Sequence, residues 1–266
     1  MKKLVALILV TMFITTANAD DRSFRFGLTL SPNIGWFNPD LNGLSNDGVR
    51  LGYSFGLMGD FRLGDNYAIS TGLNVLNMGG SIQYPDVHLP DTDNFSSASP
   101  GQTTATLAYR YVDIPFTIKM KTNEIGYMTY FGQFGLGTSV NIRSRADLVT
   151  RSIMTSRESY SVEGIDVSSQ TPLLRMGLII GLGAEYNLSG NTRIMFGVTY
   201  NNSIFNQFRS NRITPIDTQA GSFDRKINSY EADGQGFAKV EDGELVGGDG
   251  FKAFNNIIML NFGIFF

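Results

Sequence analysis

The chain has 266 residues, no cysteine, one histidine, 30 glycines, 17% charged residues and a net charge of -3. The lack of cysteine excludes disulfide scaffolds, thiolate metal sites, iron–sulfur clusters and cysteine nucleophiles, and a single histidine excludes multi-histidine metal centres. The acidic balance, without any basic run, argues against nucleic acid as a partner.

Residues 1–19 have the pattern of a cleaved secretory signal peptide. Two lysines precede the apolar stretch Leu4 to Ile14, and Ala17-Asn18-Ala19 supplies the small-x-small pattern typical of a cleavage site. The apolar stretch is shorter than a helix that spans a bilayer, and an uncleaved N-terminal anchor is the alternative reading. We therefore predict an exported protein with one domain over residues 20–266.

The rest of the chain alternates apolar and polar residues with a period of two, which is typical of β-strands with two different faces. The first such segment, 24–36, places Phe24, Phe26 and Leu28 on one face and glycine or polar residues on the other. The pattern returns in seven later segments: 49–63, 67–75, 111–120, 129–142, 174–188, 193–201 and 258–266. The sequence therefore predicts eight strands.

The connections between these segments alternate in length. Short connections at 64–66, 121–126 and 189–191 contain the glycine and asparagine that tight hairpins favour. Long connections fall at 38–47, 85–104, 144–171 and 206–253. This alternation predicts an all-β fold, an eight-stranded antiparallel up-and-down transmembrane β-barrel with four long extracellular loops and three short periplasmic turns. We expect it to be integral to the bacterial outer membrane, with both termini in the periplasm.

The distribution of charge favours this arrangement over a soluble lipocalin-like barrel, whose apolar residues would point inward. Ionisable residues, Arg50 among them, share the parity opposite to the large apolar residues in nearly every segment. Because an eight-stranded barrel is just wide enough for side chains to fill, we expect them to pair in a narrow lumen that is no diffusion pore. The candidates for lumen ion pairs are Arg25, Asp60, Arg62, Asp113, Lys119, Arg175, Glu185 and Arg193.

Pro115 interrupts the fourth predicted strand. Proline has no N–H to donate to a β-ladder, so within a sheet it belongs at an edge or a bulge. Since a closed barrel has no edge, we expect a bulge at Pro115 that also tilts Asp113 into the lumen.

The last predicted strand ends on an aromatic residue. One of its faces holds Leu260, Phe262, Ile264 and Phe266, which resembles the terminal-strand signal read by the barrel assembly machinery. We therefore expect that machinery as a partner. Aromatic residues near strand ends also predict girdles at the two membrane interfaces: Trp36, Tyr53, Tyr67, Tyr130, Tyr186 and Tyr200.

Short motifs give the chain a resemblance to a known family. Residues 109–119, Tyr-Arg-Tyr-Val-Asp-Ile-Pro-Phe-Thr-Ile-Lys, look like the aromatic-x-aromatic-x-x-Ile-Pro-x-x-x-Lys signature of the PorT-like outer-membrane β-barrel family. Residues 181–186, Gly-Leu-Gly-Ala-Glu-Tyr, and 260–264, Leu-Asn-Phe-Gly-Ile, match forms usual in that family. The resemblance covers essentially the whole chain after the signal peptide. It implies an integral outer-membrane protein. A few members serve type IX protein secretion, so an accessory role there, with secretion-system proteins as partners, is an alternative.

Catalysis is another alternative, because some eight-stranded barrels modify lipids. The one histidine, His88, lies in a proline-bounded loop segment near Ser96, Ser97 and Ser99. A serine–histidine–acid arrangement would need the fold to bring these residues together. We expect a solvated histidine, no cofactor and no enzymatic activity, with an outer-membrane lipid-modifying enzyme as the alternative.

The long connections are the expected carriers of a specific role. Residues 231–249 contain six acidic residues, for which we expect a solvated loop, with calcium binding as the alternative. The third long loop carries Arg143, Arg145, Arg151 and Arg157, which could donate bidentate hydrogen bonds to lipopolysaccharide phosphates. We therefore predict a structural or interaction protein that acts through its extracellular loops, with the outer-membrane lipid bilayer and lipopolysaccharide as partners.

Overall fold

The computed structural model describes residues 24–40, 44–88, 99–152, 158–168, 171–190, 192–208, 215–218, 221–224, 239–241, 244–246 and 252–266. The predicted signal peptide lies outside these residues. The strands are β1 (Phe24–Pro39), β2 (Ser45–Arg62), β3 (Tyr67–His88), β4 (Ser99–Lys121), β5 (Met128–Ser152), β6 (Glu158–Asp166), β7 (Leu174–Ser189), β8 (Thr192–Ser203), β9 (Pro215–Thr218), β10 (Gly221–Asp224), β11 (Lys239–Glu241), β12 (Glu244–Val246) and β13 (Ala253–Phe265). Among the described residues, no helix is long and apolar enough to cross a membrane.

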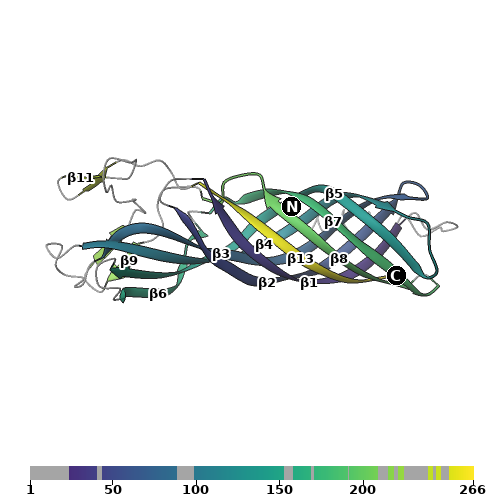
Figure 1. Ribbon diagram of the computed structural model, residues 1–266, viewed down its shortest axis with the longest axis horizontal. Helices are drawn as coiled ribbons and strands as arrows, with labels where there is room; N and C mark the ends of the chain where they lie inside the picture. Colours follow the sequence, from purple (N-terminus) through teal and green to yellow (C-terminus); the bar gives the residue numbers. More distant parts are fainter. Residues whose placement is uncertain are drawn as a thin grey trace, which may run out of the picture.

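Eight strands close into a single barrel (Figure 1). Neighbours in the order β1, β2, β3, β4, β5, β7, β8 and β13 pair antiparallel, and β13 pairs with β1 to complete the ring. At the closure, Leu28 of β1 faces Ile264 of β13 on one side and Leu57 of β2 on the other. A closed sheet has no free edge, which is the condition for a sheet to stand in lipid. The predicted eight-stranded antiparallel up-and-down barrel is confirmed.

The two ends of the barrel differ. Tight connections join β2 to β3, β4 to β5 and β7 to β8 at one end, where Gly126 and Gly190 adopt positive φ angles of 67° and 59° that favour glycine. Phe24 in β1 pairs with Phe61 beside these turns, and Phe265 near the C-terminus pairs with Gly27. We call this the tight-turn end and the opposite one the long-loop end. The C-terminus lies at the tight-turn end, on the right in Figure 1.

Three strands are much longer than the sequence pattern predicts. β3 ends at His88 rather than Val75, β4 begins at Ser99 rather than Tyr111, and β5 ends at Ser152 rather than Ile142. Figure 1 shows β3 and its neighbours projecting past the barrel wall at the long-loop end.

β6 lies within the third expected loop. It pairs with the far part of β5, where Arg145 faces Asp166, while β7 pairs with the near part up to Val140. Much of the expected connections 85–104 and 144–171 is therefore strand, and the predicted boundaries were wrong there.

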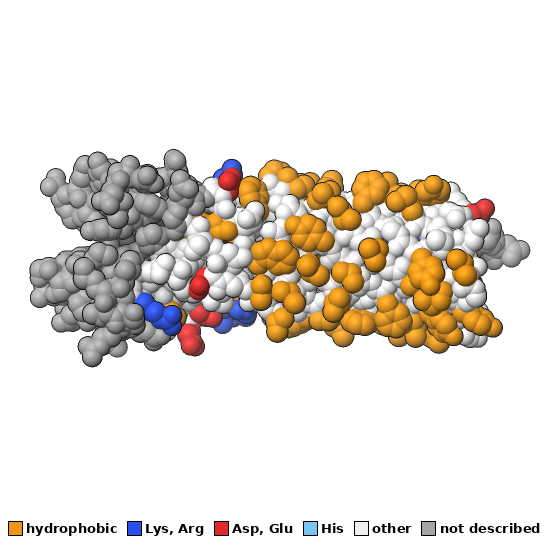
Figure 2. Space-filling model, viewed as in Figure 1, with side chains coloured by type: hydrophobic (Ala, Val, Ile, Leu, Met, Phe, Trp, Pro, Cys, Tyr) orange, Lys and Arg blue, Asp and Glu red, His pale blue; other side chains and the backbone are white. Residues whose placement is uncertain are grey.

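The outer face of the barrel is apolar over the half nearer the tight-turn end. Leu51 on β2 is 75% exposed and Leu182 on β7 is 68% exposed, although both are large apolar side chains. On the face seen in Figure 2, hydrophobic side chains form a belt, and charged side chains lie beyond its margins. Aromatic residues also face outward: Tyr67, Tyr130 and Tyr186 lie near the tight-turn end, and the rings of Trp36 and Tyr200 stack 6.4 Å apart nearer the long-loop end.

The two faces of the long strands exchange character at one level of the barrel. On β4 the outward positions from Val112 to Met120 are apolar, but from Gln102 to Arg110 they are polar or small. The inward positions change the other way, from Lys119, Thr117 and Asp113 to buried tyrosine, leucine and alanine. The parity of the strand does not change. Only the polarity of each face does.

The inward apolar residues of the long-loop half form one buried cluster, which we call the apolar cluster. A polar outer face and an apolar interior are the pattern of a soluble barrel, so the outer face of this half suits contact with water. Its members are Phe37, Leu44, Leu76, Met78, Ile82, Tyr84, Ala105, Leu107, Tyr109, Tyr111, Ala146, Leu148, Val167, Phe208, Ala253 and Ile257.

The expected bulge at Pro115 was wrong. The ladder between β3 and β4 skips Ile114 and Pro115 without a change of register, so the missing N–H is accommodated as a gap. The bulge lies instead on β5, where Tyr111 pairs with Asn141 and Arg110 with Arg143, leaving Ile142 as the extra residue. The insertion turns Arg143 and Arg145 to the outer face of the barrel.

Candidate functional site

Charged side chains fill the lumen near the tight-turn end. Lys119 and Lys121 project inward from β4 between two carboxylates, Asp60 from β2 and Glu185 from β7. The Lys119 Nζ lies 2.9 Å from Asp60 Oδ2 and 3.6 Å from Glu185 Oε1, and the Lys121 Nζ lies 3.1 Å and 2.8 Å from the same atoms. Each lysine therefore bridges strands on different sides of the ring. Ser70 Oγ completes the site by donating to Asp60 Oδ1 at 2.7 Å.

Two arginines flank this group. Arg25 Nη2 lies 3.4 Å from Glu185 Oε2 and 3.6 Å from Asp60 Oδ2, and Arg193 Nη1 lies 3.8 Å from Glu185 Oε2. Glu185 is thus within ion-pair distance of four cations. We call these six residues the ion cluster: Arg25, Asp60, Lys119, Lys121, Glu185 and Arg193.

Aromatic rings border the ion cluster. The Lys119 Nζ lies 4.9 Å from the ring centre of Phe131 and 5.1 Å from that of Phe265, and Arg25 lies 5.7 Å from the Phe265 ring. Lys119, Glu185 and Phe265 have no solvent-exposed surface. Since the cluster holds four cations and two anions, the faces of these rings stabilise part of its excess positive charge.

A second polar group lies further toward the long-loop end. Ser139 Oγ donates to Asp113 Oδ1 at 2.6 Å, and Arg175 Nη2 donates to Asn201 Oδ1 at 2.8 Å. Arg175 is 1% exposed, and its Nε and Nη1 have no hydrogen-bond partner among the described residues. Buried donors of this kind suit internal water, since water can complete hydrogen bonds that side chains leave unmade.

The apolar cluster lies inside the barrel beyond this second group. The Tyr109 ring lies 6.2 Å from Phe37 and 6.0 Å from Tyr111, centre to centre. Burial, reinforced by the neighbouring Tyr111, raises the pKa of the Tyr109 hydroxyl well above its usual value of 10.0, so the residue is neutral at physiological pH. The lumen is therefore occupied in three successive layers: charged, polar and apolar.

Most of the predicted lumen candidates lie inside the barrel, but Arg62 does not. It is exposed at the tight turn after β2, where its Nη2 pairs with Asp65 Oδ1 at 3.0 Å. Lys121 belongs to the ion cluster although it was assigned to a turn. Its parity with Lys119 is the signal in the sequence, but the predicted strand ends one residue before it.

The residues of the expected assembly signal lie on the outer face of β13. Leu260, Phe262, Ile264 and Phe266 are 48%, 44%, 43% and 43% exposed. Their alternation with buried Phe265 places the predicted signal residues on the outer face of the strand and Phe265 on its inner face.

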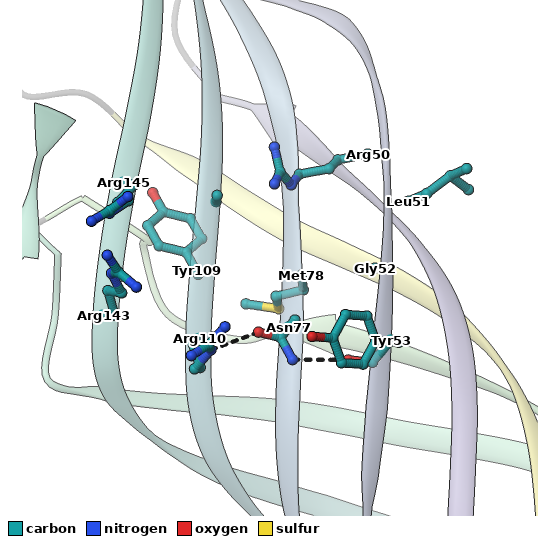
Figure 3. A pocket seen from close by; sticks show the side chains of 11 residues that line it. Arg50, Leu51, Gly52, Tyr53, Asn77, Met78, Tyr109, Arg110, Arg143 and Arg145 are labelled. Carbon is teal, nitrogen blue, oxygen red and sulfur yellow. Dashed lines mark hydrogen bonds between the residues drawn. The ribbon is translucent and has the colours of Figure 1, made fainter. Parts of the chain in front are cut away.

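A cleft lies on the wall of β2 to β5, at the level where the faces exchange character (Figure 3). Its volume is about 250 Å³. Its lining residues are Arg50, Leu51, Gly52, Tyr53, Asn77, Met78, Ala108, Tyr109, Arg110, Arg143 and Arg145. We call it the arginine cleft, because it holds four arginines and no acidic residue.

Arg50 was expected to face the lumen but lies in this cleft. The register between β2 and β3 shifts between Val49 and Tyr53, which releases Arg50 from the parity of its neighbours. In Figure 3 its side chain extends from β2 across β3. A Cβ at Gly79 of β3 would lie 2.6 Å from Arg50 Cδ, so the absence of a side chain there makes room for this arginine.

Other predicted residues lie outside the part of the chain whose side chains are described. These are His88 with Ser96, Ser97 and Ser99, the acidic residues between 231 and 249, and Arg157. In the described part, no three histidine, aspartate or glutamate side chains are close enough together to hold a metal ion.

Comparison with known proteins gives a family match and distant structural similarities. The family model for the outer membrane protein beta-barrel domain matches residues 16–209. Neisserial surface protein A is similar at 11% identity and a TM-score of 0.33, over 90% of this chain and 95% of that one. OprG from Pseudomonas aeruginosa is similar at 9% identity and a TM-score of 0.36, over 91% and 96%. No curated protein matches the chain. Similarity at this level carries no functional argument.

Proposed function

Because this chain belongs to the family of outer membrane protein β-barrel domains, we propose that it is a closed barrel that acts as a structural or interaction protein through its long-loop end. The family and the apolar belt make it an integral protein of the bacterial outer membrane. We assign the tight-turn end to the periplasm, because short turns there and long loops outside are the rule for such barrels. Both ends of the mature chain are then periplasmic.

The filled lumen is the observation that carries this proposal. Lys119 and Glu185 have no exposed surface in the charged layer, and Tyr111 and Ile257 have none in the apolar layer. A solute would have to displace both layers. Separating the buried charges would cost several kcal/mol per ion. These layers support a closed lumen rather than a diffusion pore, and we infer that the barrel makes its specific contacts on its outside.

Solute flux through reconstituted protein tests this proposal. We expect liposomes that contain the mature protein to swell no faster in arabinose than empty liposomes, and planar bilayers to show no steady conductance. A trimeric porin reconstituted in parallel is the positive control. Swelling at a rate comparable with the porin would refute the closed lumen.

The motif at residues 109–119 supports a second proposal, an accessory role in type IX secretion. Its residues serve the interior here: Tyr109 and Tyr111 pack in the apolar cluster and Lys119 anchors the ion cluster. Affinity purification from outer membranes followed by mass spectrometry tests the role. Recovery of secretion-system proteins would support it, and their absence while the assembly machinery is recovered would count against it.

We propose no enzymatic activity for this chain. A lipid-modifying enzyme would have to rest on the single histidine, His88. Replacing it (His88→Ala) is expected to leave the acylation pattern of lipid A unchanged, measured by mass spectrometry of extracted lipid. A changed pattern would revive the enzymatic reading.

A further inference from the structure

We propose that the arginine cleft binds the phosphorylated headgroup of a lipid in the outer leaflet, of the kind that lipid A presents. This inference rests on the outer-membrane location and the orientation proposed above. It adds a ligand class and a site. The site is formed by Arg50, Arg110, Arg143 and Arg145, from three different strands.

The β-ladder places these residues side by side. Tyr53, Asn77, Arg110 and Arg143 form one row across β2, β3, β4 and β5, because each pairs with the next in register. Arg110 Nε donates to Asn77 Oδ1 at 2.8 Å, which fixes the guanidinium against β3. All four residues of the row face outward.

The next row toward the long-loop end forms the hollow. Gly79 pairs with Ala108, and Ala108 pairs with Arg145, so two of its three positions are small. Arg50 reaches across Gly79 from one side and Arg145 stands on the other (Figure 3). The row beyond it is polar, with Ser81 and Thr106 joined by a 3.0 Å hydrogen bond between their hydroxyls. Gly79 and Ala108 therefore form the bottom of the cleft, and the guanidinium groups of Arg50 and Arg145 flank it.

The arginines have little charge compensation. Within the described part of the chain, Arg50, Arg143 and Arg145 form no ion pair, and Arg110 binds a neutral amide. The nearest acidic group in the ladder is Asp166 of β6, which pairs with Arg145 in the same row and interacts with it electrostatically. Asp147 lies further toward the long-loop end, where it accepts from the Gly164 N–H at 2.7 Å. Among the described residues, Arg50, Arg110 and Arg143 therefore lack an acidic neighbour, while Arg145 faces Asp166 at the edge of the cleft of about 250 Å³.

The depth of the cleft in the membrane selects the ligand. From Met120 to Arg110, β4 advances ten residues. At about 3.3 Å per residue and a tilt of about 40°, they span roughly 25 Å along the barrel axis, the height of the apolar band of an outer-membrane barrel. Arg110 therefore lies at the outer margin of the belt, at the level of lipid headgroups.

The sides of the cleft differ in polarity. Leu51 and Tyr53 line it from the belt, and Ile142 precedes Arg143 on β5 with 55% of its surface exposed. A ligand that suits both sides carries phosphate toward the arginines and hydrocarbon toward the belt. Arginine is the side chain whose planar donors match phosphate oxygens in pairs. A free inorganic phosphate would use the same donors without the apolar contacts.

Binding measurements with defined lipids test this assignment. The mature protein, purified free of lipopolysaccharide in detergent, is titrated with bis-phosphorylated lipid A, with the same lipid after removal of its phosphates, and with inorganic phosphate as a competitor. We expect tight binding of the phosphorylated lipid, at least tenfold weaker binding of the dephosphorylated one, and no competition by equimolar phosphate. Equal binding of both lipids would overturn the proposal. Competition by equimolar phosphate would assign the cleft to a free anion and overturn the lipid assignment.

Variants locate the binding. Arg110→Ala combined with Arg143→Ala is expected to weaken binding on the order of 100-fold, since each charge-assisted arginine contact is worth about tenfold. The Lys version of the same pair keeps the charge, loses the paired donors, and should fall between it and the wild type. Arg62→Ala, at the opposite margin of the belt, is the matched control with unchanged affinity. Heat-modifiable migration in gels verifies folding. Unchanged affinity in the folded double Ala variant would overturn the proposal, and this outcome is independent of the solute-flux test.

Discussion

Replacing Glu185 with glutamine should destabilise the barrel strongly while changing almost nothing in its shape. Arg25, Lys119, Lys121 and Arg193 all lie within 3.8 Å of the Glu185 carboxylate. After Glu185→Gln, Asp60 is the one carboxylate left within the ion cluster, and Arg193 keeps its ion pair with Glu124 at 3.5 Å. Removal of one partner from a buried ion pair costs about 3–5 kcal/mol, because the remaining charge stays buried without compensation. We expect a loss of that size in the free energy of unfolding.

A second substitution distinguishes charge balance from packing. Lys121→Met in the Glu185→Gln background removes one cation together with the anion, so the cluster returns to its original charge difference. The double variant should recover at least about 1 kcal/mol relative to the sum of the two single effects, the usual coupling of residues within one network. A pure packing defect would not be repaired in this way.

Unfolding in urea from lipid vesicles measures these free energies. The chain contains a single tryptophan, Trp36, whose ring stacks on Tyr200 at the outer face and should report barrel opening by fluorescence. A loss below about 1 kcal/mol for Glu185→Gln would refute the view that this carboxylate holds the cations together. Strict additivity of the two single substitutions would refute the coupling.

Three other predictions follow from separate layers of the structure. Phe265→Ala should lower the free energy of unfolding by about 3–5 kcal/mol in the same assay, since the ring is fully buried against Lys119. Phe266, which is 43% exposed, is the matched control: Phe266→Ala should change stability by less than about 1 kcal/mol and slow membrane assembly instead. Equal effects of the two variants on stability would contradict the assignment of faces. Leu107→Ala should cost about 2–5 kcal/mol and raise amide hydrogen exchange in the long-loop half of β3 and β4, and unchanged exchange would count against an apolar core there. Because burial raises the pKa of Tyr109, its hydroxyl contributes stability that is complete below pH 10 and is lost as the pH rises above it. The pH at which half of the protein is unfolded by alkali should therefore be higher in Tyr109→Phe. An unchanged midpoint pH would contradict the burial of this hydroxyl.

The membrane half of the barrel was predictable because lipid imposes a strict code. Every second residue from Phe26 to Leu30 and from Leu260 to Ile264 is apolar, and a membrane barrel repeats this alternation on every strand, with glycine and ionisable residues on the opposite face. Tight turns with glycine then fixed the order of the strands. Chain order and parity together predict that Arg25, Asp60 and Glu185 lie in one lumen.

The long-loop half was missed because its code is reversed. Stretches such as Ser81-Ile82-Gln83 and Thr104-Ala105-Thr106-Leu107 alternate with the same period, but their outward residues are the small and polar ones that are also common in loops. Composition alone does not separate the two cases. The outward orientation of Arg50 and Arg143 is not predictable from parity, since each depends on a register irregularity that only pairing with the neighbouring strand defines.

In the arginine cleft, too, the alternation of the sequence predicts part of the arrangement, and the pairing of strands supplies the rest. Arg143 and Arg145 were predicted to meet phosphates, but as members of a loop. The structure pairs Arg143 with Arg110 and places Arg145 beside Ala108 in the next row of the same wall. It excludes Arg62 from the ion cluster, because Arg62 pairs with Asp65 at the turn after β2. A side chain on a paired strand loses little further freedom on binding, which favours a defined ligand over a diffuse attraction.

The exchange of character along β4 means that the same substitution should have opposite consequences at two places on one strand. A leucine introduced at an outward position between Arg110 and the tight-turn end would contact lipid and be tolerated. At Thr104 or Thr106 it would contact water and promote association between molecules. A serine placed inward would be harmless beside Thr117 and harmful at Leu107. Which substitutions the barrel tolerates therefore depends on two solvents, which meet at the level of the row that contains Arg110 and Arg143.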